Sequence, residues 1–221
     1  MSKTAKIRKI DFLLPPNLAS IARILITPFI GYYLWVGTDS ATIICVILLA
    51  FAALTDFVDG FLARRLGQFT ELGLILDPLA DKILTITLII ELIFFRDFPI
   101  WLAIVILARD VAIMALAAVL VRKKDVIPSS NLTGKYYFAS IAFLLISYVI
   151  RFDFGISLFQ YIVMILLLVS SFNYSRLFRR IRKGRQVISF KDRVAFKIGR
   201  FGLSVAVIAV YIYRLLTDTL F

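Results

Sequence analysis

The chain has 221 residues, 61% of them apolar, and its mean hydropathy is +0.93. A soluble domain of this length cannot hide so much apolar surface, so the composition predicts an all-α polytopic membrane protein. The chain has no histidine, which excludes His-based acid–base catalysis, Ser-His-Asp hydrolysis and His-ligated zinc or haem. We attribute the net charge of +12 to contact with anionic lipid headgroups and not with nucleic acid.

Six long apolar segments follow one another along the chain and predict a bundle of six core transmembrane helices. Each segment has close to the ~20 residues that a helix needs to cross a bilayer. The fifth is the shortest of the six. The segments are residues 18–36, 41–63, 74–95, 98–121, 136–151 and 156–177.

The two ends of the chain extend beyond this core. Ile7–Leu14 alternates basic and apolar residues, which predicts either a short interfacial helix ahead of the first span or a frayed tail. Near the other end, residues 201–216 form an apolar run of 16 residues, short for a crossing. We expect a seventh span there or a helix packed on the bundle. The predicted domains are therefore a transmembrane domain, 1–180, and a basic tail with a hydrophobic segment, 181–221.

The basic residues lie in alternate connections, which predicts the orientation in the membrane. The N-terminal segment, the loop after the second span, the loop after the fourth and the tail after the sixth are all rich in Lys and Arg. The opposite connections offer only Arg96 and Arg151. Since positive loops stay in the cytoplasm, we expect a protein of the cytoplasmic membrane whose N-terminus, second loop and basic tail face the cytoplasm.

Four aspartates flank the loop after the second predicted span. Asp56 and Asp59 are three residues apart and Asp77 and Asp81 are four apart, so each pair shares one helix face. A short connection makes the two helices antiparallel neighbours, which lets the four carboxylates converge. Carboxylates at membrane depth need a compensating cation, and no comparable cluster of Lys or Arg shares these faces. A lone aspartate here is commonly an interfacial cap, but the whole constellation favours a site for two ions of Mg²⁺ or Mn²⁺.

Small residues surround the aspartates. Gly60 and Ala63 extend the face of Asp59, and Gly73 lies one turn before Asp77. Small side chains let a backbone or a flat ligand approach closely, although they also serve plain helix packing. Arg64 follows at the end of the helix, where a planar guanidinium can hold a phosphate.

The whole pattern resembles the signature of the CDP-alcohol phosphotransferase family, with every position filled. It reads Asp56-x-x-Asp59-Gly60-x-x-Ala63-Arg64, eight residues, then Gly73-x-x-x-Asp77-x-x-x-Asp81. The resemblance covers roughly residues 12–180. It implies a homodimeric membrane enzyme that joins a CDP-linked donor to an alcohol and releases CMP.

The resemblance also implies roles for the signature residues. All four aspartates would hold metal, and Asp81 would also be the catalytic base that takes the proton from the acceptor hydroxyl. Gly60, Ala63, Arg64 and Gly73 would contact the CDP part of the donor.

Further residues bear on the acceptor. The segment Pro16–Arg23, which includes Asn17, resembles the opening of the family branch that makes phosphatidylglycerophosphate, except that Ala19 stands where Thr or Ser is usual. Asn17 and Arg23 are therefore expected to bind substrate. Arg109 lies inside the fourth span, where it either pairs with Asp110 or Glu91 or binds an anion. Together with Lys82 and Lys135, it would suit a phosphorylated acceptor such as glycerol 3-phosphate.

The expected reaction is thus CDP-diacylglycerol plus glycerol 3-phosphate giving phosphatidylglycerophosphate plus CMP. The nearest alternative is a cardiolipin synthase that uses phosphatidylglycerol. An inositol-phosphate or archaeal ether-lipid acceptor is a further alternative within the family. From a different class, a cation transporter could use four aspartates as an ion path, although transport sites usually lie near the bilayer midplane.

Overall fold

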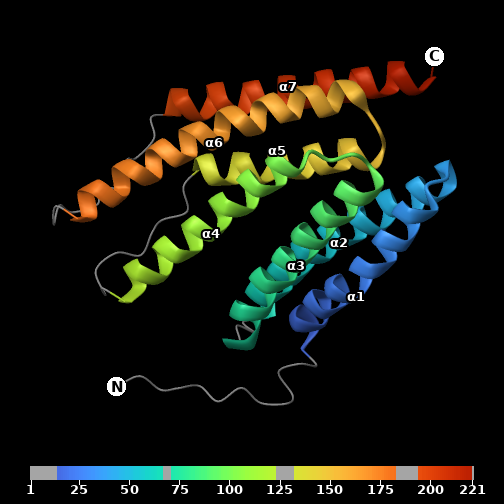
Figure 1. The fold of residues 1–221 in the computed structure, drawn as a ribbon. Helices are drawn as coiled ribbons and strands as arrows, with labels where there is room; N and C mark the ends of the chain where they lie inside the picture. The colour runs from blue at the N-terminus through green and yellow to red at the C-terminus, as the bar shows by residue number, and fades with distance from the viewer. Residues whose placement is uncertain (1–13, 67–70, 123–131, 183–193, 221) are drawn as a thin grey trace. The chain divides into compact units, whose positions relative to one another are not determined.

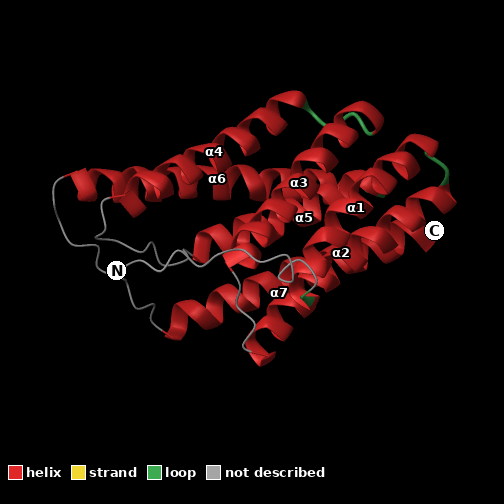
Figure 2. Cartoon of the chain, turned by 90° about the horizontal axis from the view of Figure 1, so that it is seen from below, coloured by secondary structure: helices red, strands yellow, loops and turns green. Residues whose placement is uncertain are grey.

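The computed structural model describes residues 14–66, 71–122, 132–182 and 194–220, and every element in these ranges is a helix (Figures 1 and 2). The chain forms two compact units, residues 1–100 and 101–221. The helices are α1 (Pro15–Val36), α2 (Asp39–Leu66), α3 (Glu71–Phe95), α4 (Ile100–Arg122), α5 (Leu132–Val149), α6 (Asp153–Arg182) and α7 (Val194–Leu220).

The all-α prediction is confirmed for the described residues, and the first six helices follow the six predicted apolar segments in order. Two stretches in the described part, Asn17–Val36 and Asp153–Asn173, are long and apolar enough to cross a membrane, and two shorter apolar stretches accompany them. These stretches are consistent with a helical membrane protein, and the count of six spans stays a prediction. The predicted interfacial helix at 7–14 lies almost wholly outside the described residues, and the predicted domain boundary near 180 stays untested.

Local sequence explains both ends of α1. Pro15 and Pro16 occupy the first helical positions, where a missing N–H is no loss and the fixed φ suits a helix. At the other end Gly37 has φ 69°, and its N–H donates to the carbonyl of Tyr33 at 3.2 Å. This left-handed cap suits glycine, and it turns the chain directly into α2.

In the first unit α1 packs along both α2 and α3 (Figure 1). The sequence had suggested α2 and α3 as direct neighbours, but their extensive contacts in the described part are with α1. Arg96, just after α3, donates from Nη1 to the carbonyl of Leu34 at 3.3 Å. This bond satisfies a carbonyl that the last turn of α1 would otherwise leave without a helical partner.

The packing of α1 is inverted relative to a soluble helix. Its polar residues share the buried face, and large apolar residues cover the exposed face. This distribution suits a helix whose outer solvent is lipid. The buried polar residues are Asn17, Ser20, Arg23 and Thr27, and the exposed apolar ones include Leu25, Phe29, Tyr32 and Trp35.

In the second unit a tight turn joins α5 to α6, and α7 runs back along α6 (Figure 1). The hydroxyls of Tyr211 on α7 and Ser147 on α5 are hydrogen-bonded at 3.1 Å. Tyr211 also meets the rings of Phe143, Phe152 and Phe159 edge to face. These contacts tie α7 to the beginning of α6, at the end opposite to the 183–193 connection.

The apolar run at 201–216 is thus the middle of a helix of 27 residues. At 1.5 Å per residue, α7 is about 40 Å long, enough to cross a bilayer. The structure shows this helix packed against α5 and α6, while its role as a seventh span stays a prediction. Apart from Tyr211, most of its described side chains are exposed.

Candidate functional site

The candidate site in the first unit is built on one face of α3. Asp77 and Asp81 lie one turn apart there, half-buried, as the spacing predicts. The buried face of α1 packs against them. Two carboxylates are therefore held between helices instead of projecting into bulk water.

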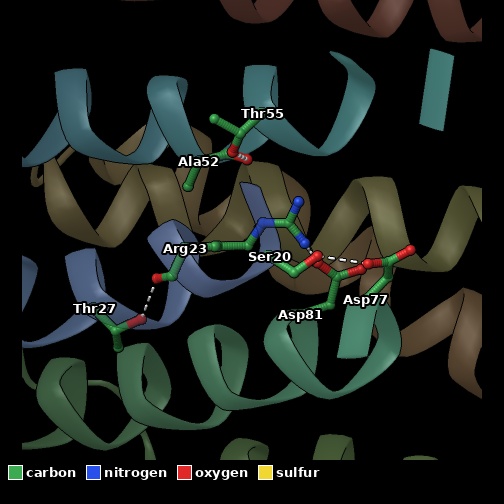
Figure 3. Close-up of polar contacts among 7 residues, drawn as sticks. All are labelled: Ser20, Arg23, Thr27, Ala52, Thr55, Asp77 and Asp81. Carbon is green, nitrogen blue, oxygen red and sulfur yellow. Dashed lines mark hydrogen bonds and ion pairs between the residues drawn. The ribbon is translucent and has the colours of Figure 1, made fainter. Parts of the chain in front are cut away.

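Two side chains of α1 bind these carboxylates directly (Figure 3). Ser20 donates from Oγ to Oδ1 of Asp77 at 2.5 Å. Arg23, whose side chain is 1% exposed, donates from Nη1 to Oδ1 of Asp81 and forms an ion pair with it. The Asp81 side chain remains 35% exposed, so it is positioned by Arg23 and still open to a reactant.

Arg23 itself is anchored by packing and by its own helix. Figure 3 shows its guanidinium pointing from α1 towards Asp81, on the side where α3 lies. Thr27, one turn further along α1, donates to the carbonyl of Arg23 at 3.0 Å. The cation is thus built into the helix packing, which distinguishes it from a mobile surface arginine.

This geometry adds to one expectation. The sequence suggested that no comparable cluster of Lys or Arg shares the faces of the aspartates, and the structure adds one cation, because Arg23 reaches Asp81 across the α1–α3 contact. The two residues are 58 positions apart, so no local spacing connects them. Arg23 was expected to bind substrate; the structure shows its ion pair with Asp81, and substrate binding stays a prediction.

The remaining residues of the signature lie on the same helices. Gly73 is buried on α3, one turn before Asp77, and Lys82 is half-buried beside Asp81. Asn17 is buried on the α1 face that carries Ser20. The other predicted members lie in the last turns of α2, where the structure describes the helix but not their side chains: Asp56, Asp59, Gly60, Ala63 and Arg64.

The donor set fits hard divalent ions. Asp77 and Asp81 offer oxygen ligands on one face, and α1 holds one oxygen of each in place. Ligating carboxylates that are themselves hydrogen-bonded are the usual arrangement in metal sites. Asp56 and Asp59, on a helix that also packs on α1, would complete a set of oxygen ligands.

Arg109 lies in the second unit and is engaged by three helices. Its Nη1 donates to Oδ1 of Asp110 at 3.0 Å, and its Nη2 donates to Oγ of Ser170 on α6 at 3.1 Å. Its guanidinium also lies 4.1 Å from the ring centroid of Tyr137 on α5. Of the two ion pairs that the sequence allowed, the structure shows the one with Asp110.

Lys135 does not accompany Arg109 in this arrangement. It is exposed on α5, two residues before Tyr137, and two residues correspond to about 200° around a helix. Lys135 therefore lies on the face of α5 opposite to Tyr137, whose ring contacts Arg109. Their joint role in binding an acceptor stays a prediction.

Sequence reasoning assigned no role to Ser20, Tyr137 or Ser170. Ser20 lies three residues from both Asn17 and Arg23, so it completes a polar stripe at helical spacing in an otherwise apolar segment. That stripe was a usable signal. Nothing comparable marks Tyr137 and Ser170, because their partner Arg109 lies far away in the chain.

Comparisons with known proteins identify the family of this chain. The model of the CDP-alcohol phosphatidyltransferase family matches residues 13–173. An Aquifex aeolicus protein named CDP-diacylglycerol--glycerol-3-phosphate 3-phosphatidyltransferase is 32% identical over 170 residues, 72% of this chain and 93% of that protein.

Two further relatives carry two different names. A Bacillus subtilis protein with the same name as the Aquifex one is 38% identical over 132 residues, 54% of this chain and 68% of that protein. A Streptomyces coelicolor cardiolipin synthase (CMP-forming) is 32% identical over 126 residues, 54% of this chain and 57% of that protein. With a match that runs from α1 into α6 and includes all four aspartates, the chain belongs to the CDP-alcohol phosphatidyltransferase family.

Proposed function

We propose that this protein transfers the phosphatidyl group of CDP-diacylglycerol to glycerol 3-phosphate and releases CMP. The observation that carries the proposal is the pairing of Ser20 with Asp77 and of Arg23 with Asp81. It positions two of the four signature carboxylates, in a chain whose relatives from Aquifex aeolicus and Bacillus subtilis are named for this reaction.

The proposed chemistry is an in-line displacement at phosphorus. The acceptor hydroxyl oxygen attacks the phosphorus that bears diacylglycerol, and the bond from that phosphorus to the oxygen bridging to CMP breaks. The electron pair of that bond leaves with CMP. Asp81 takes the proton of the acceptor hydroxyl, because the chain has no histidine and Arg23 directs this carboxylate.

Asp56, Asp59, Asp77 and Asp81 would hold Mg²⁺ or Mn²⁺, as two ions. Bound there, such ions neutralise the diphosphate and the charge that develops on the leaving CMP. Gly60, Ala63 and Gly73 give a flat ligand room beside this set, and Arg64 would contact a phosphate of the donor. Asn17 and Lys82 border the same carboxylates and are proposed to contact substrate.

Glycerol 3-phosphate is the acceptor that we favour, with Arg109 as its phosphate ligand and Lys135 as a second cation. An alternative acceptor is phosphatidylglycerol, because the Streptomyces coelicolor relative is named a cardiolipin synthase. Both acceptors present a primary hydroxyl and a phosphate ester. They differ in whether that ester carries a diacylglycerol group.

One assay separates these functions. Purified protein is incubated with CDP-diacylglycerol, Mg²⁺ or Mn²⁺ and one acceptor at a time, and the lipid product is identified by mass. We expect phosphatidylglycerophosphate and CMP with glycerol 3-phosphate. Cardiolipin from phosphatidylglycerol, with no product from glycerol 3-phosphate, would assign the second function, and no CMP with any alcohol would refute the enzyme.

The active site is proposed to face the cytoplasm, in a homodimer. In a Cys45→Ala background, cysteines at Gln68 and Gln186 should be labelled from one side of sealed vesicles. A cysteine at Thr219 should be labelled from the other side, because α7 is proposed to be a seventh span. Labelling of positions 68 and 186 from opposite sides would contradict the six-span core, and crosslinking in native membranes would test the dimer.

A further inference from the structure

The second unit contains a buried hydroxyl that the helix packing leaves unused. Tyr137 on α5 is 1% exposed. Its hydroxyl oxygen is buried and finds no hydrogen-bond partner among the residues that the structure describes. A buried polar group without a partner costs about 1–3 kcal/mol, whereas phenylalanine would fill the same space without that cost.

The ring that carries this hydroxyl lies against a cation, and a second hydroxyl binds the same cation. The Arg109 guanidinium lies over the ring of Tyr137 at 4.1 Å. Ser170, itself 1% exposed, accepts a hydrogen bond from Arg109. Because Ser170 accepts with its oxygen, its own O–H proton is available to donate.

The three side chains together form a donor set on α4, α5 and α6. A guanidinium and two hydroxyls are the groups that bind phosphate-ester oxygens. Asp110 balances the charge of Arg109 and fixes its orientation. Neutral hydroxyl donors would then decide how tightly an oxygen-rich anion binds.

We propose that Tyr137 determines acceptor specificity: its buried hydroxyl donates to an oxygen of the acceptor's phosphate ester, while its ring holds the Arg109 guanidinium that binds the same group. The inference rests on the proposed function and adds a residue to it. The phosphate ester can belong to a free phosphorylated alcohol or to a lipid headgroup, and the test separates these sources.

The test compares Tyr137→Phe with Tyr136→Phe in the full-length protein. Tyr137→Phe keeps the ring over Arg109 and removes only the hydroxyl. We expect the KM for glycerol 3-phosphate to rise about tenfold, with kcat and the KM for CDP-diacylglycerol unchanged. Tyr136→Phe removes the same group from the neighbouring residue, which is half-buried, and should change none of these constants.

Tyr137→Leu, which also removes the ring, should raise the acceptor KM further by releasing the guanidinium. Titration calorimetry with glycerol 3-phosphate, without turnover, should show a loss of affinity in both variants and a larger loss in Tyr137→Leu. An unchanged acceptor KM in Tyr137→Phe would overturn the inference and leave the proposed function intact. A higher KM for CDP-diacylglycerol alone would overturn it as well, because the hydroxyl would then serve the donor.

Assays with different acceptors separate the proposed function from the proposed role of Tyr137. If the wild type uses phosphatidylglycerol only, the proposed acceptor is wrong, and the inference stands provided that Tyr137→Phe raises the KM for phosphatidylglycerol. If it uses neither compound and binds neither, both proposals are overturned. If unphosphorylated glycerol is turned over and its KM rises in Tyr137→Phe as much as that of glycerol 3-phosphate, the hydroxyl does not contact the phosphate, and the inference is overturned.

Discussion

Helices α1 and α7 both expose large apolar side chains, but they bury different residues. α1 hides a polar stripe that binds the aspartates of α3, whereas α7 hides Tyr211 among aromatic rings. In lipid an exposed apolar face is ordinary and carries no functional information. The buried polar side chains therefore distinguish α1, which binds the proposed catalytic carboxylates, from α7, which shows only packing contacts among the described residues.

The largest expected loss of activity comes from replacing the carboxylates that α1 holds. Asp77→Asn removes a proposed metal ligand but keeps the shape of the side chain. We expect CMP release to fall about 10²- to 10³-fold, with metal binding lost in parallel. Titration calorimetry with Mn²⁺ measures the loss of metal binding. Full activity in the presence of a chelator would refute the metal site.

Asp81→Asn should differ from Asp77→Asn. It removes the proposed base, so turnover should be lost while part of the metal and CDP-diacylglycerol affinity remains. Equilibrium binding of both ligands to the variant measures this difference. A turnover rate near that of the wild type would show that Asp81 is not the base.

Arginines on the two helices give the next test of the comparison. Arg23→Gln removes the group that orients Asp81, and we expect activity to fall about 10- to 100-fold, with partial recovery in Arg23→Lys. Arg214→Gln is the matched control on α7, where Arg214 is exposed and lies 5.2 Å from the ring centroid of Phe154. It should leave CMP release unchanged. Equal losses in both variants would remove the distinction between the helices.

Packing of α7 is tested at two glycines. A Cβ at Gly155 would lie 2.5 Å from a ring carbon of Phe152, 2.6 Å from Oγ of Ser147 and 2.7 Å from a ring carbon of Tyr211. Gly155→Ala should therefore lower the free energy of unfolding by about 1–3 kcal/mol. Gly202→Ala, where a Cβ meets nothing within 4 Å, should be neutral or slightly stabilising. Thermal unfolding in detergent compares the two.

The smallest effect concerns one hydrogen bond of α7. Tyr211→Phe removes the bond to Ser147 and keeps the aromatic contacts. We expect a loss of about 0.6 kcal/mol, typical of a hydrogen bond between membrane helices. Tyr213→Phe, on the exposed side of α7, is the control and should leave the melting temperature unchanged. If CMP release falls in Tyr211→Phe, α7 has a role beyond packing.

Some of these features could be predicted from the sequence because the pattern that marks each of them lies within one short segment. Apolar runs predicted α1 to α6, and the spacing of Asp77 and Asp81 predicted their shared face. The extension of α7 to residue 194 could not be predicted from hydropathy, because Lys197 and Arg200 interrupt the apolar run. The Arg23–Asp81 pair could not be predicted either, since it depends on how α1 packs against α3.

A last consequence concerns bilayer thickness. Polar bonds join α1 and α3 near both ends, through Ser20 and Arg23 at one end and through Arg96 and the Leu34 carbonyl at the other. Sliding one helix past the other would break both sets at once. In thicker or thinner lipid we therefore expect the pair to tilt as one body, the usual response to hydrophobic mismatch. The register between Arg23 and Asp81 is preserved as the acyl chains change length.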